Sequence, residues 1–213
     1  MIARVITVAQ QKGGAGKTTL AAHLAVAWTA QKKKVAVVDI DPQMSLTAWY
    51  RVREAARGDA GAGLLVNQIK GWRVRNEVET LARDHDVVII DSPPHAETEA
   101  RVAVRAADLV LIPVQPSPMD VWATRPTLEL ALEEKTPALL VLNRVPPRAN
   151  LTEQMLQQIA DLNAEVAKAR IGNRVVFAAA LSEGKAVGEV QPSGKAAREI
   201  NALAKELYRR AGS

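Results

Sequence analysis

Gln10-Gln11-Lys12-Gly13-Gly14-Ala15-Gly16-Lys17-Thr18-Thr19 is the stretch of this chain that decides its fold. It follows an apolar run from Ile2 to Ala9 and precedes a helical pattern that begins at about Lys17. In a strand, glycine turn and helix of this kind, backbone amides surround an anion without interference from Cβ atoms, and the helix points its positive end at the same anion. The stretch therefore predicts a phosphate-binding loop made of Gly13, Gly14, Ala15, Gly16, Lys17, Thr18 and Thr19.

Two side chains of the loop suit a nucleoside triphosphate with Mg²⁺. Lys17 supplies a mobile positive charge for the β- and γ-phosphate oxygens, and Thr18 supplies a hydroxyl for the metal. The ordinary pattern Gly-x-x-x-x-Gly-Lys-[Ser/Thr] requires a glycine where Gln11 stands, and a second lysine, Lys12, follows directly. Because Lys12 lies on the outer limb of the loop, its charge is predicted to act across a dimer.

The loop resembles the deviant Walker A motif of the ParA/MinD superfamily of dimerising ATPases. The resemblance implies that Lys12 is the signature lysine, which reaches the nucleotide of the partner subunit. The stretches 41–49 and 112–120 extend the resemblance to the small ParA-type partition ATPases of the ParF kind. Those proteins lack an N-terminal helix-turn-helix domain, and a first strand starting at residue 2 leaves no room for one. We expect a single ATPase domain over residues 1–213.

Composition excludes several classes of function. The chain has 213 residues, of which 48% are hydrophobic and 24% charged, as expected of one globular domain. Cysteine is absent, which excludes disulfides, a catalytic thiol and the iron–sulfur clusters that some relatives of this loop carry. No run approaches the length of a membrane span and no signal peptide is visible, so the protein is expected to be cytoplasmic.

The charge balance is basic. The formal net charge is +5, from 28 Lys and Arg against 23 acidic residues, and the isoelectric point is near 9.6. A nonspecific polyanion such as DNA is one interpretation. A basic surface that serves solubility is the other, and charge alone leaves both open.

The hydrophobic pattern predicts an α/β fold, namely a doubly wound, mostly parallel sheet with helices on both faces. Continuously apolar runs predict the strands, which are Ile2 to Ala9, Val35 to Asp39, Leu64 to Ile69, Val87 to Asp91, Leu109 to Val114, Ala138 to Asn143 and Val175 to Ala179. Helices are predicted over Lys17 to Gln31, Met44 to Ala56, Val74 to Arg83, Glu97 to Arg105, Met119 to Glu134, Thr152 to Arg170 and Gly194 to Arg210.

Carboxylates follow two of the predicted strands, at the sheet edge where such folds bind ligands. Asp91 follows an apolar run as a Walker B aspartate does and is a candidate Mg²⁺ ligand, with Thr18. Asp39 and Asp41 are two residues apart, so both face the same side of an extended strand. The resemblance implies that Asp39 supports the metal and the loop lysine and that Asp41 positions the attacking water. With Gln43, Asp41 would form a first switch segment that senses the γ-phosphate, and Ser92 to His95 would form the second.

Two positions are candidates for contact with adenine. Asn143 ends the sixth predicted strand, where members of the family often bind the base edge. Pro192 could pack on the other face of the base, although N-capping of the last helix by Ser193 explains that loop equally well.

The resemblance implies a slow, partner-stimulated ATPase that forms a homodimer around two ATP molecules and binds nonspecific DNA in that state. It would position a plasmid, chromosome or other cargo, be nucleoid-associated, and respond to a ParB-like adaptor. Candidate DNA contacts are Arg170, Arg174, Lys185, Lys195 and Arg198.

Two alternatives remain open. One is an ATP-dependent carboxylate-amidating ligase of related fold, and the other is a MinD-like ATPase that regulates division. A membrane anchor is not expected, because Ile200, Leu203, Ala204 and Leu207 form a helical stripe suited to packing on the protein's own sheet, and no bulky aliphatic residue follows it.

Overall fold

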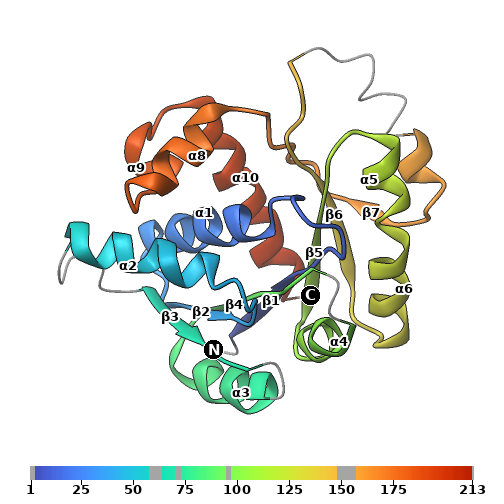
Figure 1. Ribbon diagram of the computed structural model, residues 1–213, viewed down its shortest axis with the longest axis horizontal. Coiled ribbons are helices and arrows are strands. Elements are labelled where there is room, and N and C mark those ends of the chain that lie inside the picture. The colour runs from blue at the N-terminus through green and yellow to red at the C-terminus, as the bar shows by residue number, and fades with distance from the viewer. Residues whose placement is uncertain (1–2, 58–63, 71–72, 95–96, 148–156, 213) are drawn as a thin grey trace.

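A parallel β-sheet forms the middle layer of the molecule in the computed structural model (Figure 1), which describes residues 3–57, 64–70, 73–94, 97–147 and 157–212. Within these ranges the strands are β1 (Arg4–Val8), β2 (Val35–Asp39), β3 (Leu64–Gln68), β4 (Val87–Asp91), β5 (Leu109–Val114), β6 (Ala138–Leu142) and β7 (Glu165–Val166). Their order is β3-β2-β4-β1-β5-β6-β7, and each ladder is parallel. The predicted parallel sheet is confirmed.

Helices cover both faces of the sheet. One face carries α1 (Lys17–Ala30), α2 (Ser45–Arg57), α8 (Val175–Ser182), α9 (Val187–Val190) and α10 (Lys195–Arg210), which share one apolar cluster with it. The other face carries α3 (Val74–Asp84), α4 (Glu97–Arg105), α5 (Pro118–Trp122) and α6 (Arg125–Glu133), which form two further clusters. Figure 1 shows these two helical layers on opposite sides of the strands.

The central strands are apolar at every position because both of their faces are covered. In β4, Val87 and Ile89 pack with α1 and α10, whereas Val88 and Ile90 pack with α3 and α4. All four side chains are completely buried. A strand buried on both faces loses the polar alternation of a half-exposed strand, which is why the sequence pattern located it.

The predicted strand Val175 to Ala179 is wrong, because this run forms most of helix α8. Phe177 and Ala180, three residues apart, are buried, and Val175 is 84% exposed. A short apolar run does not distinguish a buried strand from a helix by periodicity, and the three consecutive alanines favour helix. The seventh strand is instead Glu165–Val166, inside the predicted helix Thr152 to Arg170.

Two predicted helices are therefore corrected. Within Thr152 to Arg170, residues 152–156 lie outside the described residues, 157–160 are helical, and the chain turns at Asn163, whose φ of 51° is tolerated by asparagine. The predicted helix Met119 to Glu134 is divided into α5 and α6. Pro126, at the start of α6, lacks the N–H that a continuous helix would need there.

The strand order places β1 between β4 and β5. The chain runs from β1 to β2 on one side, and from β4 past β1 to β5 on the other, so the direction of winding reverses beside β1. Ligands of such folds bind at this reversal point. The last predicted helix is confirmed as α10, and its stripe packs in the cluster with α1. None of the helices in the described ranges is both long and apolar enough to cross a bilayer.

Candidate functional site

The loop after β1 leads directly into the N-terminus of α1. Gly14 and Gly16 have φ values of 78° and 92°, a left-handed conformation that residues with a Cβ rarely adopt. A Cβ on Gly16 would also lie 2.5 Å from Asn143 Nδ2. Gly16 caps α1 without a side-chain hydrogen bond, so the first amides of α1 have no side-chain acceptor at this cap. This geometry suits a phosphate group at the positive end of the helix.

Lys17 is buried at the base of the loop. Its ammonium group donates to the backbone oxygen of Gln10 at 3.0 Å. Burial lowers the pKa of Lys17, while the charges of Asp91 and Asp41 act in the opposite direction. A phosphate would offer this ammonium a charged acceptor in place of a backbone carbonyl.

Thr18 and Asp91 meet at the end of β4. Thr18 Oγ1 donates to Asp91 Oδ2 at 2.8 Å, and Asp91 Oδ1 is buried without a hydrogen-bond partner among the described residues. Burial raises the pKa of Asp91 to about 7, although the hydrogen bond from Thr18 opposes this. A buried acceptor without a partner is costly, and a hydrated Mg²⁺ would satisfy it. The residues here therefore fit the predicted metal, which would neutralise charge on bound phosphates.

Asp39 holds the start of α2. Its Oδ2 accepts from the backbone N of Thr47 at 2.9 Å and from Thr47 Oγ1 at 2.7 Å. Its Oδ1 accepts from the backbone N of Asp41 at 3.2 Å. Asp39 pairs with Asp91 in the register of β2 and β4, so the predicted metal ligands Thr18, Asp39 and Asp91 share one edge. In this structure the Asp39 carboxylate organises the segment 41–47, a role that the sequence did not indicate.

Asp41 lies at the rim of the same edge. Its Oδ1 accepts from the backbone N of Gln43 at 2.9 Å, which forms a side-chain turn and leaves the second oxygen available. Its charge raises the pKa of both Lys17 and Asp91, so the carboxylate lies near the base of the loop. The location is compatible with positioning a water, which stays a prediction. Ser92 and Pro94 belong to the proposed second switch, whereas His95 lies outside the described residues.

Lys12 forms an ion pair that sequence reasoning missed. Its ammonium nitrogen lies 2.8 Å from Asp120 Oδ2 on α5, and Asp120 is buried. Ser117 donates to the same carboxylate. Gln115 fixes the loop from the same side, with its amide nitrogen donating to the oxygen of Gly14 at 3.0 Å. Asp120 and Gln115 lie about a hundred residues from the loop, and no local pattern connects them to it.

Asn143 closes the far end of the loop. Its Nδ2 donates to the oxygen of Ala15 at 2.8 Å. Beside it lies a cavity of about 290 Å³ lined by Gly16, Thr19, Leu20, Asn143, Arg144 and residues 171–175, 177 and 178. A nucleoside attached to a phosphate in the loop would be within reach of this cavity.

Pro192 lies elsewhere. It lines a smaller cavity of about 130 Å³ that also includes His23 and Ala186, so the structure does not bring Pro192 and Asn143 to one cavity. A contact of Pro192 with adenine stays a prediction. The capping alternative is wrong, since the N-cap of α10 is Gly194 with no side-chain hydrogen bond. The backbone oxygen of Ser193 accepts from Arg198 instead.

The candidate DNA contacts fall into two groups. Arg174 and Lys185 are half-buried and form ion pairs with Glu199 and Glu183, at 2.5 and 2.8 Å. Arg174 also lines the cavity beside Asn143, which makes it a poor candidate for DNA contact. The exposed members are Arg170, Lys195 and Arg198, the last two in the first turn of α10.

Comparison with known proteins gives consistent results. The chain is 34% identical over 211 residues to the maintenance of carboxysome distribution protein A of Halothiobacillus neapolitanus, with 95% of each protein covered. It is 26% identical to the chromosome partitioning protein ParA of Myxococcus xanthus, over 98% of this chain and 89% of that protein. The septum site-determining protein MinD of Pyrococcus horikoshii, solved with Mg-ADP, has the same fold, with a TM-score of 0.82 at 22% identity over 99% of this chain and 98% of that one.

A family model spans the loop, the carboxylate edge and Asn143. It is described as the CobQ/CobB/MinD/ParA nucleotide binding domain and matches residues 6–187, most of the chain. The matched residues include the loop after β1 and the carboxylates after β2 and β4. The chain therefore belongs to the CobQ/CobB/MinD/ParA nucleotide-binding family.

Proposed function

We propose that this protein is a ParA-type ATPase that closes as a homodimer around two ATP molecules with Mg²⁺. In the dimeric state it binds nonspecific DNA and positions a cargo, and hydrolysis stimulated by a ParB-like adaptor releases it. It acts as a single domain over residues 1–213 in the cytoplasm, associated with the nucleoid. Family membership supports the general part of this proposal, that the protein is a ParA/MinD-type ATPase.

The observation that carries the proposal is the position of Lys12. Lys17 already occupies the base of the loop, so a second lysine at the rim is not needed to neutralise one phosphate from within the chain. The Lys12 side chain is 37% exposed and is held away from the loop interior by Asp120. An exposed cation at the rim, paired with a carboxylate that it can leave, suits contact with the nucleotide of a facing subunit.

Three features support a slow reaction. Lys17 and the Mg²⁺ held by Thr18 and Asp91 would neutralise phosphate charge, and Asp41 would accept a hydrogen bond from the attacking water. The other two carboxylates described at this edge have partners of their own: Asp39 accepts from Thr47 and from the backbone N of Asp41, and Asp91 accepts from Thr18 and would hold the metal. Positioning without strong base catalysis gives slow turnover, which a partner can accelerate.

DNA binding is supported by the net charge of +5 and by Lys195 and Arg198 at the exposed start of α10. Two cargo classes are supported by the names of the similar proteins, carboxysomes and chromosomes. The higher identity to the carboxysome protein favours an organelle-like cargo as a second candidate beside a plasmid or chromosome centromere complex.

The test is binding to a random-sequence DNA duplex without nucleotide, with ADP and with a slowly hydrolysed ATP analogue, over a series of salt concentrations. We expect binding only with the analogue and a steep loss with salt, because several phosphate contacts are assembled at once. Lys12→Ala should lose binding, whereas Lys34→Ala, which removes an exposed charge before β2, should retain it.

Absence of DNA binding in every nucleotide state would refute the DNA-based function. Turnover stimulated by a small carboxylic acid and ammonia or glutamine would then support the ligase alternative, and binding to anionic lipid vesicles would support a MinD-like protein.

A further inference from the structure

We propose that the ion pair between the buried Arg53 and the partly buried Glu189 links the γ-phosphate end of the site, through α2, to the segment α8–α9. The two side chains would thereby make the conformation of residues 183–191 depend on whether ATP or ADP is bound. This inference rests on the proposed function only in requiring that the loop binds both nucleotides.

The link begins at the carboxyl end of β2. Asp39 accepts two hydrogen bonds from Thr47, in the first turn of α2, and one from the backbone of Asp41. A nucleotide that draws Asp41 or its neighbours toward the phosphate therefore pulls on the N-terminal turn of α2. Because a helix is stiff over 13 residues, the displacement reaches its far turns.

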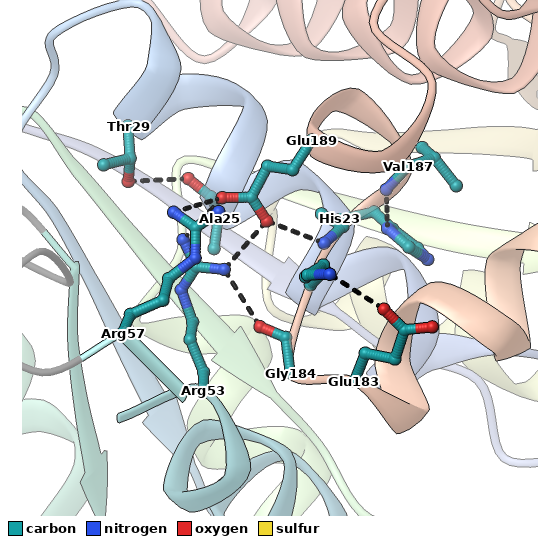
Figure 2. A network of polar contacts seen from close by, with 11 residues as sticks. His23, Ala25, Thr29, Arg53, Arg57, Glu183, Gly184, Val187 and Glu189 are labelled. Atoms are coloured by element: carbon teal, nitrogen blue, oxygen red, sulfur yellow. Dashed lines mark hydrogen bonds and ion pairs between the residues drawn. The ribbon is translucent and has the colours of Figure 1, made fainter. Parts of the chain in front are cut away.

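Arg53 transmits the position of α2 to the turn after α8. Only 4% of its side chain is exposed; Nη1 donates to the oxygen of Gly184 at 3.0 Å, and the two guanidinium nitrogens contact both oxygens of Glu189 at 2.9 Å (Figure 2). Gly184 has a φ of 66°, and a Cβ there would lie 2.6 Å from Arg53 Cα. The backbones of α2 and this turn are therefore in direct contact, so one cannot slide without moving the other.

Glu189 passes the connection to α9 and to the phosphate-loop helix. Its Oε2 accepts from the backbone N of Ala186 at 2.8 Å, which holds the first turn of α9. The next residue, Val187, donates to Nδ1 of His23 on α1, and His23 contacts the backbone oxygen of Phe177 on α8, both at 3.3 Å. Phe177 lines the cavity beside Asn143. Helix α2 and these polar contacts together connect the carboxyl end of β2 with the wall of the cavity beside Asn143.

The chemistry of the pair suits a switch better than a stability element. A buried ion pair contributes little net stability relative to apolar residues of the same volume. Arg53 Nε has no hydrogen-bond partner among the described residues. Arg57, one helical turn further along α2, lies 2.8 Å from Glu189 Oε1, the oxygen that Arg53 Nη2 also contacts. Because Arg53 and Arg57 both contact Glu189, the carboxylate would keep a charged partner if α2 shifted.

The experiment is hydrogen–deuterium exchange of the full chain saturated with ADP or with a slowly hydrolysed ATP analogue, with the affinity for each nucleotide measured separately. In the wild type we expect amides of residues 183–191 to exchange about fivefold more slowly with the analogue than with ADP. The double variant Arg53→Met/Glu189→Met should abolish this difference while nucleotide affinity stays within about twofold. Arg75→Met/Glu79→Met, an exposed ion pair on α3, is the matched control and should retain it.

A second variant keeps the inference testable if the double variant does not fold. Glu189→Gln preserves the shape and the acceptor for Ala186 but removes the charge, and it should reduce the difference in exchange at least twofold. If the pair is merely structural, its loss should speed exchange equally with both nucleotides and leave the ratio of the two exchange rates unchanged. That result would overturn the inference. Equal exchange rates with ADP and with the analogue in a wild-type protein that binds both nucleotides would overturn it too. Failure to bind either nucleotide would refute the proposed function itself.

Discussion

His23 is expected to make the stability of this protein fall steeply in mild acid. The ring is buried in α1, where Nδ1 accepts from the backbone N–H of Val187. The other ring nitrogen, Nε2, therefore carries the hydrogen and donates to the oxygen of Phe177, so the neutral ring satisfies both contacts. A second proton, on Nδ1, would face the N–H of Val187, which is itself a donor and cannot accept it.

The magnitude follows from the pKa. Burial lowers the pKa of His23 from 6.5, its value in an unfolded chain, to about 4. The hydrogen bond to Phe177 and the charge of Glu189 act in the opposite direction. The unfolded chain therefore binds the proton first as the pH falls. This contribution to stability is fully present above about pH 6.5 and is lost toward pH 4. The whole shift in pKa corresponds to a loss of about 3 kcal/mol in the free energy of unfolding, of which about 2 kcal/mol is lost between pH 7 and about pH 4.5.

The assay is urea unfolding between pH 7.5 and about pH 4.5, for the wild type and His23→Gln. Glutamine offers one acceptor and one donor group but does not titrate, and all other groups titrate alike in both proteins. We expect the variant to be less stable at pH 7 and the difference to shrink by about 2 kcal/mol at the acid end. His85→Gln controls for the loss of a histidine elsewhere. Parallel stability curves for wild type and His23→Gln would refute the reasoning.

Three further outcomes are expected. Lys12→Ala should bind ATP but not form the ATP-dependent dimer in light scattering, and a persistent dimer would contradict its cross-subunit role. Asp41→Ala should bind ATP and dimerise while phosphate release falls at least about a hundredfold, so wild-type turnover would exclude it as the water-positioning residue. Trp28→Phe should lower the free energy of unfolding in urea by about 2 kcal/mol, because the completely buried indole fills the core and donates to the oxygen of Ala204. Trp122→Phe, at a side chain that is 64% exposed, should change it by less than about 0.5 kcal/mol, and equal effects would refute that explanation.

Much of the fold was predictable because its signals are local. Strands β2, β4 and β5 are runs of apolar residues that need cover on both faces, and their ends agree with the structure to the residue. The failures have local causes too. Val175 to Ala179 has an apolar composition that suits either a strand or a helix, and only its neighbours decide. Tertiary packing placed Val175 in solvent and Phe177 in the core.

The candidate site divides in the same way. The loop and the aspartates after β2 and β4 were identified from sequence because each is adjacent in the chain to the strand that positions it. The structure brings Thr18, Asp39 and Asp91 to one edge, as parallel strands require. The partner of Lys12, in contrast, was not predictable. Asp120 reaches Lys12 across 108 residues of sequence, and spacing carries no information about such a contact.

By itself, the sequence of this protein determined a strand, a glycine loop and a helix in the arrangement of phosphate-binding loops, together with the parallel sheet around them, because these depend on backbone conformation and on neighbouring residues. Only the tertiary structure decided what each charge does. Asp91 Oδ1 is buried without a hydrogen-bond partner among the described residues, the ion pair to Asp120 holds Lys12 at the rim, and Arg53 with Glu189 connects α2 to α9. The physical reason is that the energy of a charge depends on its solvent exposure and on partners distant in sequence, and both arise only when the chain packs.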